Sequence, residues 1–166
     1  INRLLIPGML ARRAVKGELP LIPAARALQD ELLGPPALAA ADDSALADEL
    51  RTVEACKKTA LMVFGLAMQT YGHGLGDQQE VLMHVADMLI DTFSADSAVL
   101  RARAAAVDDG TRASLHADAA RVFVNDAAMR IEASAKQALA AMAEGDSLRT
   151  MLAALRRLLK VPPVNT

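Results

Sequence analysis

The sequence predicts an all-α protein, an antiparallel bundle of three long helices with shorter helices beside it. Two observations predict this class. Hydrophobic residues make up 53% of the 166 residues and aromatic residues only 2%, while alanine, leucine and arginine, which favour helices, are abundant. Apolar residues also recur over long stretches with a period of about 3.6 residues, the signature of a helix with one buried face.

Three long helices are expected from residue 44 onward. The first follows a cap at Asp43 or Ser44 and runs to about Tyr71, and the second begins near Asp77 and extends to Val107. Long helices joined by short loops pack antiparallel. The sequence therefore predicts a bundle whose alanine-rich inner faces approach one another closely.

The third long helix is expected to start at a Thr111 cap and to stop at Gly145, after which Asp146 caps a short last helix. Each helix carries one apolar stripe at helical spacing. These stripes predict the core residues: Leu46, Leu50, Val53, Cys56, Ala60, Phe64, Ala67 and Tyr71 in the first helix; Val81, Val85, Met88, Leu89 and Phe93 in the second; Ala120, Phe123, Val124, Ala127, Ile131, Ala135, Ala138 and Met142 in the third; and Leu148, Met151, Leu152, Leu155 and Leu159 in the last.

The N-terminal part is expected to form two shorter helices. Residues 2–16 form a helix that is interrupted at Pro7-Gly8, and Gly17 stops it. A second helix, about Pro23–Leu33, ends at Gly34-Pro35-Pro36, because proline lacks the amide donor. The chain is accordingly divided into residues 1–17, a short helix and linker at 18–43, and a C-terminal bundle at 44–166.

The charge balance and the single cysteine exclude several classes of protein. A formal net charge of −2 argues against a general nucleic-acid binder. Cys56 is the only cysteine, so an intramolecular disulfide is impossible and a reducing compartment is favoured. Residues 59–76 carry no formal charge, but their strongly apolar part stops at Met68, so a buried core helix is favoured over a membrane span. The start at Ile1 rather than methionine indicates a fragment.

Two of the expected helices carry residues that could bind a metal ion. A di-metal centre in a bundle needs Glu-x-x-His on two helices, and this motif does not occur in the sequence. We therefore interpret these residues as a solvated polar face and assign no metal site. The residues considered are Glu80, His84, Asp87, Asp91, His116 and Asp118.

A reactive cysteine and anion-binding segments are weaker candidates. Cys56 has Lys57 and Lys58 beside it, but adjacent residues do not share a helix face, so an inert buried thiol is favoured. The run Gly72–Gly76 precedes a helix N-terminus, where an anion could bind, but no strand precedes it, so an interhelical turn is favoured. No catalytic residue is assigned.

Basic residues at helix ends are interpreted as solvated cations that favour helix C-termini: Arg12, Arg13, Lys16, Arg156, Arg157 and Lys160.

Several short motifs resemble the acyl-CoA dehydrogenase family in their order and spacing. INRLLI at residues 1–6 resembles the segment that follows the Glu-Gly-Thr motif of these flavoenzymes. Three further segments follow in the same order: Lys57-Lys58-Thr59-Ala60-Leu61, the helix opened by Gln79-Glu80, and the tail from Asp146 to Lys160. Together they resemble the extra C-terminal domain of the very-long-chain branch.

The resemblance implies that residues 1–17 end the last helix of the catalytic core and that the rest is an appended helical domain. In the family, the glutamate of Glu-Gly-Thr removes the α-proton of the acyl-CoA thioester while the flavin accepts the hydride. That glutamate and its flavin-contacting neighbours would lie upstream of Ile1. The resemblance therefore implies FAD in the parent enzyme, and no catalytic, cofactor-binding or metal-binding residue in this fragment. Its implied role is an accessory one in the oxidation of long-chain acyl-CoA thioesters.

The resemblance also implies the partners. They are the catalytic domain of the same polypeptide and a second copy in a homodimer, because the appended domain covers the surface through which other members form tetramers. In the family the linker of this domain is implicated in membrane association, but here residues 18–43 carry five acidic residues against Arg26 alone. We expect a bacterial cytoplasmic protein without a nucleic-acid partner, with peripheral membrane contact as a lesser alternative. The alternative function is a free-standing helical protein-interaction module.

Overall fold

The computed structural model describes residues 2–35, 44–108 and 110–160, and these residues contain helices and no strand. Three long helices of 25, 30 and 33 residues form the body of the molecule. The all-α class and the three-helix bundle are thus confirmed. In chain order the elements are α1 (Asn2–Val15), α2 (Leu21–Leu33), α3 (Ala47–Tyr71), the 3-10 helix η1 (Gly72–Asp77), α4 (Gln79–Asp108), α5 (Gly110–Met142) and α6 (Gly145–Leu158).

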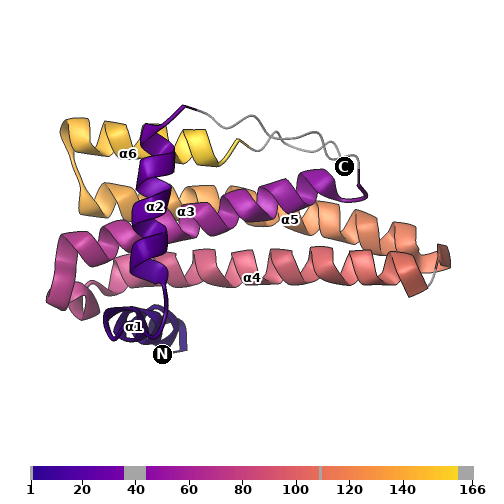
Figure 1. Ribbon diagram of the computed structural model, residues 1–166, viewed down its shortest axis with the longest axis horizontal. Coiled ribbons are helices and arrows are strands. Elements are labelled where there is room, and N and C mark those ends of the chain that lie inside the picture. The colour runs from indigo at the N-terminus through magenta and orange to yellow at the C-terminus, as the bar shows by residue number, and fades with distance from the viewer. Residues whose placement is uncertain (1, 36–43, 109, 161–166) are drawn as a thin grey trace.

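The long helices α3, α4 and α5 lie side by side, and the three shorter α-helices are gathered at one half of this bundle (Figure 1). α1 packs against α4, α2 crosses α3, and α6 lies along α3 and α5. The crossing of α2 over α3 is close at Gly65, where an added Cβ atom would lie 2.9 Å from the Cβ of Ala25. The absence of a side chain at this position therefore lets α2 approach α3.

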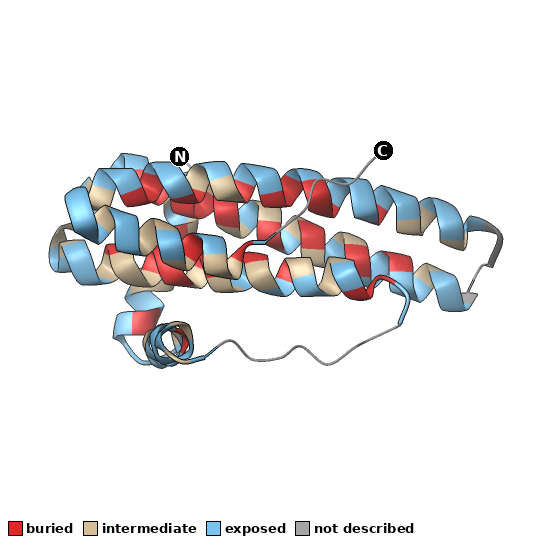
Figure 2. Cartoon of the chain, turned by 90° about the horizontal axis from the view of Figure 1, so that it is seen from above, coloured by how far each residue is buried: buried red, intermediate tan, exposed pale blue. Residues whose placement is uncertain are grey.

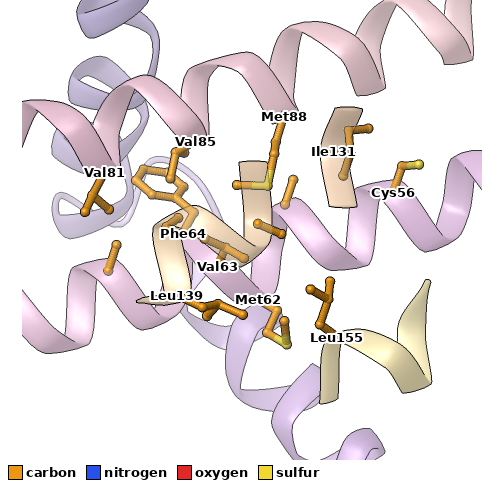
Figure 3. Packing of buried hydrophobic residues seen from close by; sticks show 14 of the residues in the cluster. Cys56, Met62, Val63, Phe64, Val81, Val85, Met88, Ile131, Leu139 and Leu155 are labelled. Atoms are coloured by element: carbon orange, nitrogen blue, oxygen red, sulfur yellow. The ribbon is translucent and has the colours of Figure 1, made fainter. Parts of the chain in front are cut away.

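The core lies where the three long helices face one another, with α2 and α6 closing it on the outside (Figure 2). Phe64 is its largest fully buried side chain, and it lies beside Val85 and Met88 of α4 (Figure 3). A second, alanine-rich cluster fills the part of the bundle nearer the α4–α5 turn. Most of the predicted stripe residues are fully buried, among them Val53, Cys56, Ala60, Phe64, Ala67, Val81, Val85, Met88, Val124, Ile131, Ala135, Ala138 and Leu155.

Two predicted core residues are exposed, and for these the prediction was wrong. Phe93 is 74% exposed and Phe123 is 36% exposed. In α4 the smaller neighbours Thr92 and Ala95 take the inward positions and are buried. The Phe123 ring lies under the guanidinium of Arg130, whose carbon is 5.8 Å from the ring centroid.

The starts of three helices differ from the predicted caps. α3 begins at Ala47, and its N-cap is Leu46, a buried residue in a left-handed conformation with φ 65°. The burial of the Leu46 side chain accounts for this unusual cap. Of the two predicted caps, Ser44 lies two residues before Leu46, and Asp43 lies outside the described residues. α5 begins at Gly110, so Thr111 is already helical.

α6 begins two residues earlier than the predicted Asp146 cap implies, at Gly145, and its N-cap is Glu144. The φ of +58° at Gly145 favours glycine at this start. Asp146 lies in the first turn, where a carboxylate is favoured by the helix dipole, and it pairs with Arg149 at 2.8 Å.

The interruption predicted at Pro7-Gly8 is not observed, because α1 is continuous through Pro7. A proline removes a single backbone hydrogen bond there, and burial of its ring against the bundle offsets part of that loss. The uncharged stretch 59–76 lies in α3 and η1, and the α3 part contributes to the core, as predicted. Among the described helices, none is long and apolar enough to cross a membrane.

Candidate functional site

The acidic face of α4 is occupied by arginines. Arg3 of α1 donates to Asp87 at 2.9 Å. Arg130 of α5 donates to both carboxylate oxygens of Asp91, at 2.9 and 3.0 Å. These hydrogen bonds raise the pKa of the Arg130 guanidinium above its ordinary value. Two of the four candidate ligands on α4 therefore hold neighbouring helices in place, and this paired arrangement was not predicted from the sequence.

The other candidate ligands do not converge with these two. In the described part of the chain, no group of three or more histidine, cysteine, aspartate or glutamate side chains could hold a metal ion. On α5, Asp118 pairs with Arg121 of its own helix at 3.0 Å. The spacing of Glu80, His84, Asp87 and Asp91 along α4 therefore does not produce a coordination site.

Cys56 lies in the core with no exposed surface, as the sequence indicates. Burial raises the pKa of its thiol from 9.0 to about 12, and the negative charge of Asp91 adds to this shift. The two adjacent lysines point elsewhere: Lys57 pairs with Asp96 at 3.1 Å and Lys58 with Glu31 at 2.6 Å. The thiol has neither the access nor the thiolate character of a nucleophile.

This environment predicts the labelling of Cys56. Between about pH 7 and 9 the folded chain is expected to react with a thiol reagent such as maleimide only as fast as it unfolds, since the thiol is buried and protonated. Unfolding in guanidinium chloride should expose one reactive thiol per chain. Mass spectrometry of labelled samples measures the labelling rate of the folded chain and the number of thiols labelled after unfolding. Rapid labelling of the folded chain would contradict a buried, inert Cys56.

A hollow of about 620 Å³ lies between α1, the end of α3 and η1. It brings together two features that the sequence singled out, the basic residues Arg12 and Lys16 and the glycine-rich run that begins at Gly72. The hollow is open to solvent, and its apolar lining includes Ala11 and Leu75. Its lining contains no carboxylate to pair with His73, so it lacks an acid–base pair for catalysis.

Arg157 is more than a solvated helix end. Its guanidinium donates to the carbonyl oxygens of Leu32 and Gly34, both at 2.6 Å, and more weakly to Glu31 at 3.5 Å. These carbonyls belong to the C-terminal end of α2, where the last carbonyl groups of a helix have no N–H donors within their own helix. Arg157 thus caps α2 from α6, a role that no local sequence signal could reveal.

Comparisons with known proteins identify the family to which this chain is similar. Residues 55–157 match the family model described as "Acyl-CoA dehydrogenase, C-terminal domain". A probable acyl-CoA dehydrogenase of Bacillus subtilis (strain 168) is 42% identical over 168 residues, which cover 99% of this chain and 28% of that protein.

A solved structure is similar over the same extent. The crystal structure of an acyl-CoA dehydrogenase complexed with FAD from Bacillus anthracis is 41% identical, with a TM-score of 0.91. The superposition covers 99% of this chain and 28% of that one, so this chain spans less than a third of the length of the relatives it matches. The chain therefore belongs to the acyl-CoA dehydrogenase family, and it corresponds to the C-terminal domain of that family.

Proposed function

We propose that this chain is the accessory C-terminal domain of a flavin-dependent acyl-CoA dehydrogenase of the very-long-chain type, which oxidises long-chain acyl-CoA thioesters in bacterial fatty acid oxidation. In this proposal the domain stabilises the enzyme and shapes its assembly into a homodimer. The reacting glutamate and the flavin belong to the rest of the polypeptide. The division into residues 1–17, 18–43 and 44–166 remains a prediction within this proposal.

The observation that carries the proposal is the two-sided apolar character of α1. Pro7 and Ala14 are buried against the bundle, whereas Leu5, Met9 and Val15 on the remaining surface are 48%, 53% and 70% exposed. A helix with apolar side chains on both sides needs a second neighbour. A catalytic body that makes up the remaining length of the relatives would supply this neighbour.

In this proposal the flavin chemistry belongs to the rest of the polypeptide. An FAD site would need a pocket with well-placed polar groups for the isoalloxazine and the pyrophosphate. The hollow beside α1 is open and mostly apolar, which supports this assignment. FAD in the parent enzyme would accept the hydride, and the residues of this chain would hold the domain in position.

The experiment compares the same substitution in two contexts, the 166-residue chain and the full-length enzyme. Met9→Glu is expected to change the stability of the chain by less than about 0.5 kcal/mol, because the side chain is exposed there. In the full-length enzyme it should lower the temperature of flavin release by several degrees, because a carboxylate would be buried without a partner. Leu115→Glu, at an exposed position of α5, is the matched control.

Two results would overturn the proposal. One is an equal effect of Met9→Glu in both contexts. The other is an isolated chain that binds FAD and turns over a long-chain acyl-CoA with an artificial electron acceptor. The alternative, a free-standing interaction module, is favoured by the exposed apolar side chains of α4 and α5. An in-frame Glu-Gly-Thr codon run just before Ile1 would exclude this alternative, whereas a start codon there would support it.

A further inference from the structure

α4 carries two apolar seams, each with the alternating three- and four-residue steps of a heptad repeat. The inner seam is buried throughout and packs in the bundle: Val81, Val85, Met88, Thr92, Ala95, Val99 and Ala102. The outer seam has the same spacing and contains no charged residue: Met83, Ala86, Ile90, Phe93, Ser97, Leu100, Ala104 and Val107. A single bundle uses only one seam of each helix, so the outer seam requires its own explanation.

Among the described residues, the outer seam is buried only at Ala86, and Met83 before it is 42% exposed. Ala86 is fully buried where α1 packs on α4, next to the Arg3–Asp87 ion pair. Beyond this point Phe93, Leu100 and Val107 are 74%, 54% and 86% exposed. The far half of α4 lies away from α1, α2 and α6 (Figure 1). Large apolar side chains in one continuous row are unusual on the surface of a monomer and mark an interaction site.

The exposed part of the outer seam is complementary to itself when two copies of α4 run antiparallel. With a two-fold axis between positions 98 and 99, Ile90 faces Val107, Phe93 faces Ala104, and Ser97 faces Leu100, each pair occurring twice. Two of these three layers place a large side chain opposite a small one, which is how packed helices interdigitate. This register also ends before the part of α4 that α1 covers.

The charges beside the seam fit the same register. Arg103 and Asp96 flank the seam on the same side, seven residues apart. In the antiparallel pair, Arg103 of one copy lies opposite Asp96 of the other. Asp96 is 30% exposed beside Lys57, and Arg103 is exposed without a carboxylate partner in the described part of the chain. An interface related by a two-fold axis requires such a self-complementary surface.

We infer that the outer seam of α4, from Ile90 to Val107, is an interface at which two copies of this chain pack antiparallel about a two-fold axis. This interface would join the two copies of the proposed homodimer, and only in this respect does the inference rest on the proposed function. An interface made by α4 alone requires that the chain associates without the catalytic body.

The test is the oligomeric state of the 166-residue chain, measured by sedimentation equilibrium. A monomer–dimer equilibrium is expected. Phe93→Glu should raise the dissociation constant at least about tenfold, equivalent to about 1.4 kcal/mol, since it places two carboxylates in an apolar interface. Leu33→Glu is the matched control, because Leu33 is 87% exposed on α2 and lies outside the seam. Circular dichroism confirms that each variant is folded.

Exchanging the flanking charges tests the register. Asp96→Arg alone and Arg103→Asp alone should each weaken the dimer, and the double variant should restore it, because the opposite charges face one another again. A chain that stays monomeric at its highest soluble concentration would overturn the inference. So would a dimer that Phe93→Glu leaves unchanged, or a double variant no stronger than the single ones. Flavin content and turnover of the full-length enzyme, measured separately, report on the proposed function alone.

Discussion

Replacing Phe64 by alanine is expected to lower the free energy of unfolding by about 3–5 kcal/mol, the largest effect of any single substitution considered for this chain. The ring is 1% exposed and lies between α3 and α4, beside Val85 and Met88 (Figure 3). Its removal leaves a cavity that the stiff long helices on both sides cannot close, so lost contacts add to the lost apolar burial. Guanidinium chloride unfolding followed by circular dichroism measures the change.

Phe93→Ala is the matched control for this prediction. Both phenylalanines lie in the middle of a long helix, and the sequence predicted both as core residues, but Phe93 is 74% exposed. Its replacement should change the free energy of unfolding by less than about 0.5 kcal/mol in protein dilute enough to be monomeric. Similar losses for the two variants would contradict the packing of α4 described above.

Replacing Arg157 by alanine is expected to lower the free energy of unfolding by about 2–3 kcal/mol. Hydrogen bonds from a charged donor contribute about 1.5–3 kcal/mol each when buried, and the estimate is reduced because Arg157 is partly exposed to water. The substitution leaves the carbonyls of Leu32 and Gly34 without this donor. Amide hydrogen exchange should therefore accelerate in α2 more than in α4 or α5.

Two variants show whether the capping geometry or merely a positive charge is responsible. Arg157→Lys should recover less than half of the loss, because an ammonium group cannot reach two carbonyls as the planar guanidinium does. Arg156→Ala should have almost no effect, because Arg156 is exposed and makes no hydrogen bond or ion pair in the described part of the chain. Equal losses at the two arginines would refute the capping role.

The position of Arg157 matters for the proposed accessory role as well. α2 is held on the bundle by the close approach at Gly65, by the Lys58–Glu31 pair and by Arg157. α1 leads directly into α2, so a loosened α2 would also loosen α1. If α1 contacts the catalytic body, as we propose, the cap on α2 contributes to the placement of that body.

The sequence by itself determined the helical class, the three long helices, the turn at Gly72 and most of the inner stripe of each helix. These features follow from local chemistry, since helix propensity, breakers and periodicity act between residues at most a few positions apart. The family resemblance was also readable from short motifs in order, and the match over residues 55–157 supports it at the level of the acyl-CoA dehydrogenase family.

Only the tertiary structure decided which of two equivalent heptad seams of α4 is buried, and hence that Phe93 is outside. It also decided that Asp91 binds Arg130, 39 residues away, and that Arg157 caps a helix more than 120 residues earlier. The physical reason is the same in each case. A periodic stripe or a charged side chain has the same local sequence whichever neighbour it meets, and the neighbour is selected by the packing of whole helices.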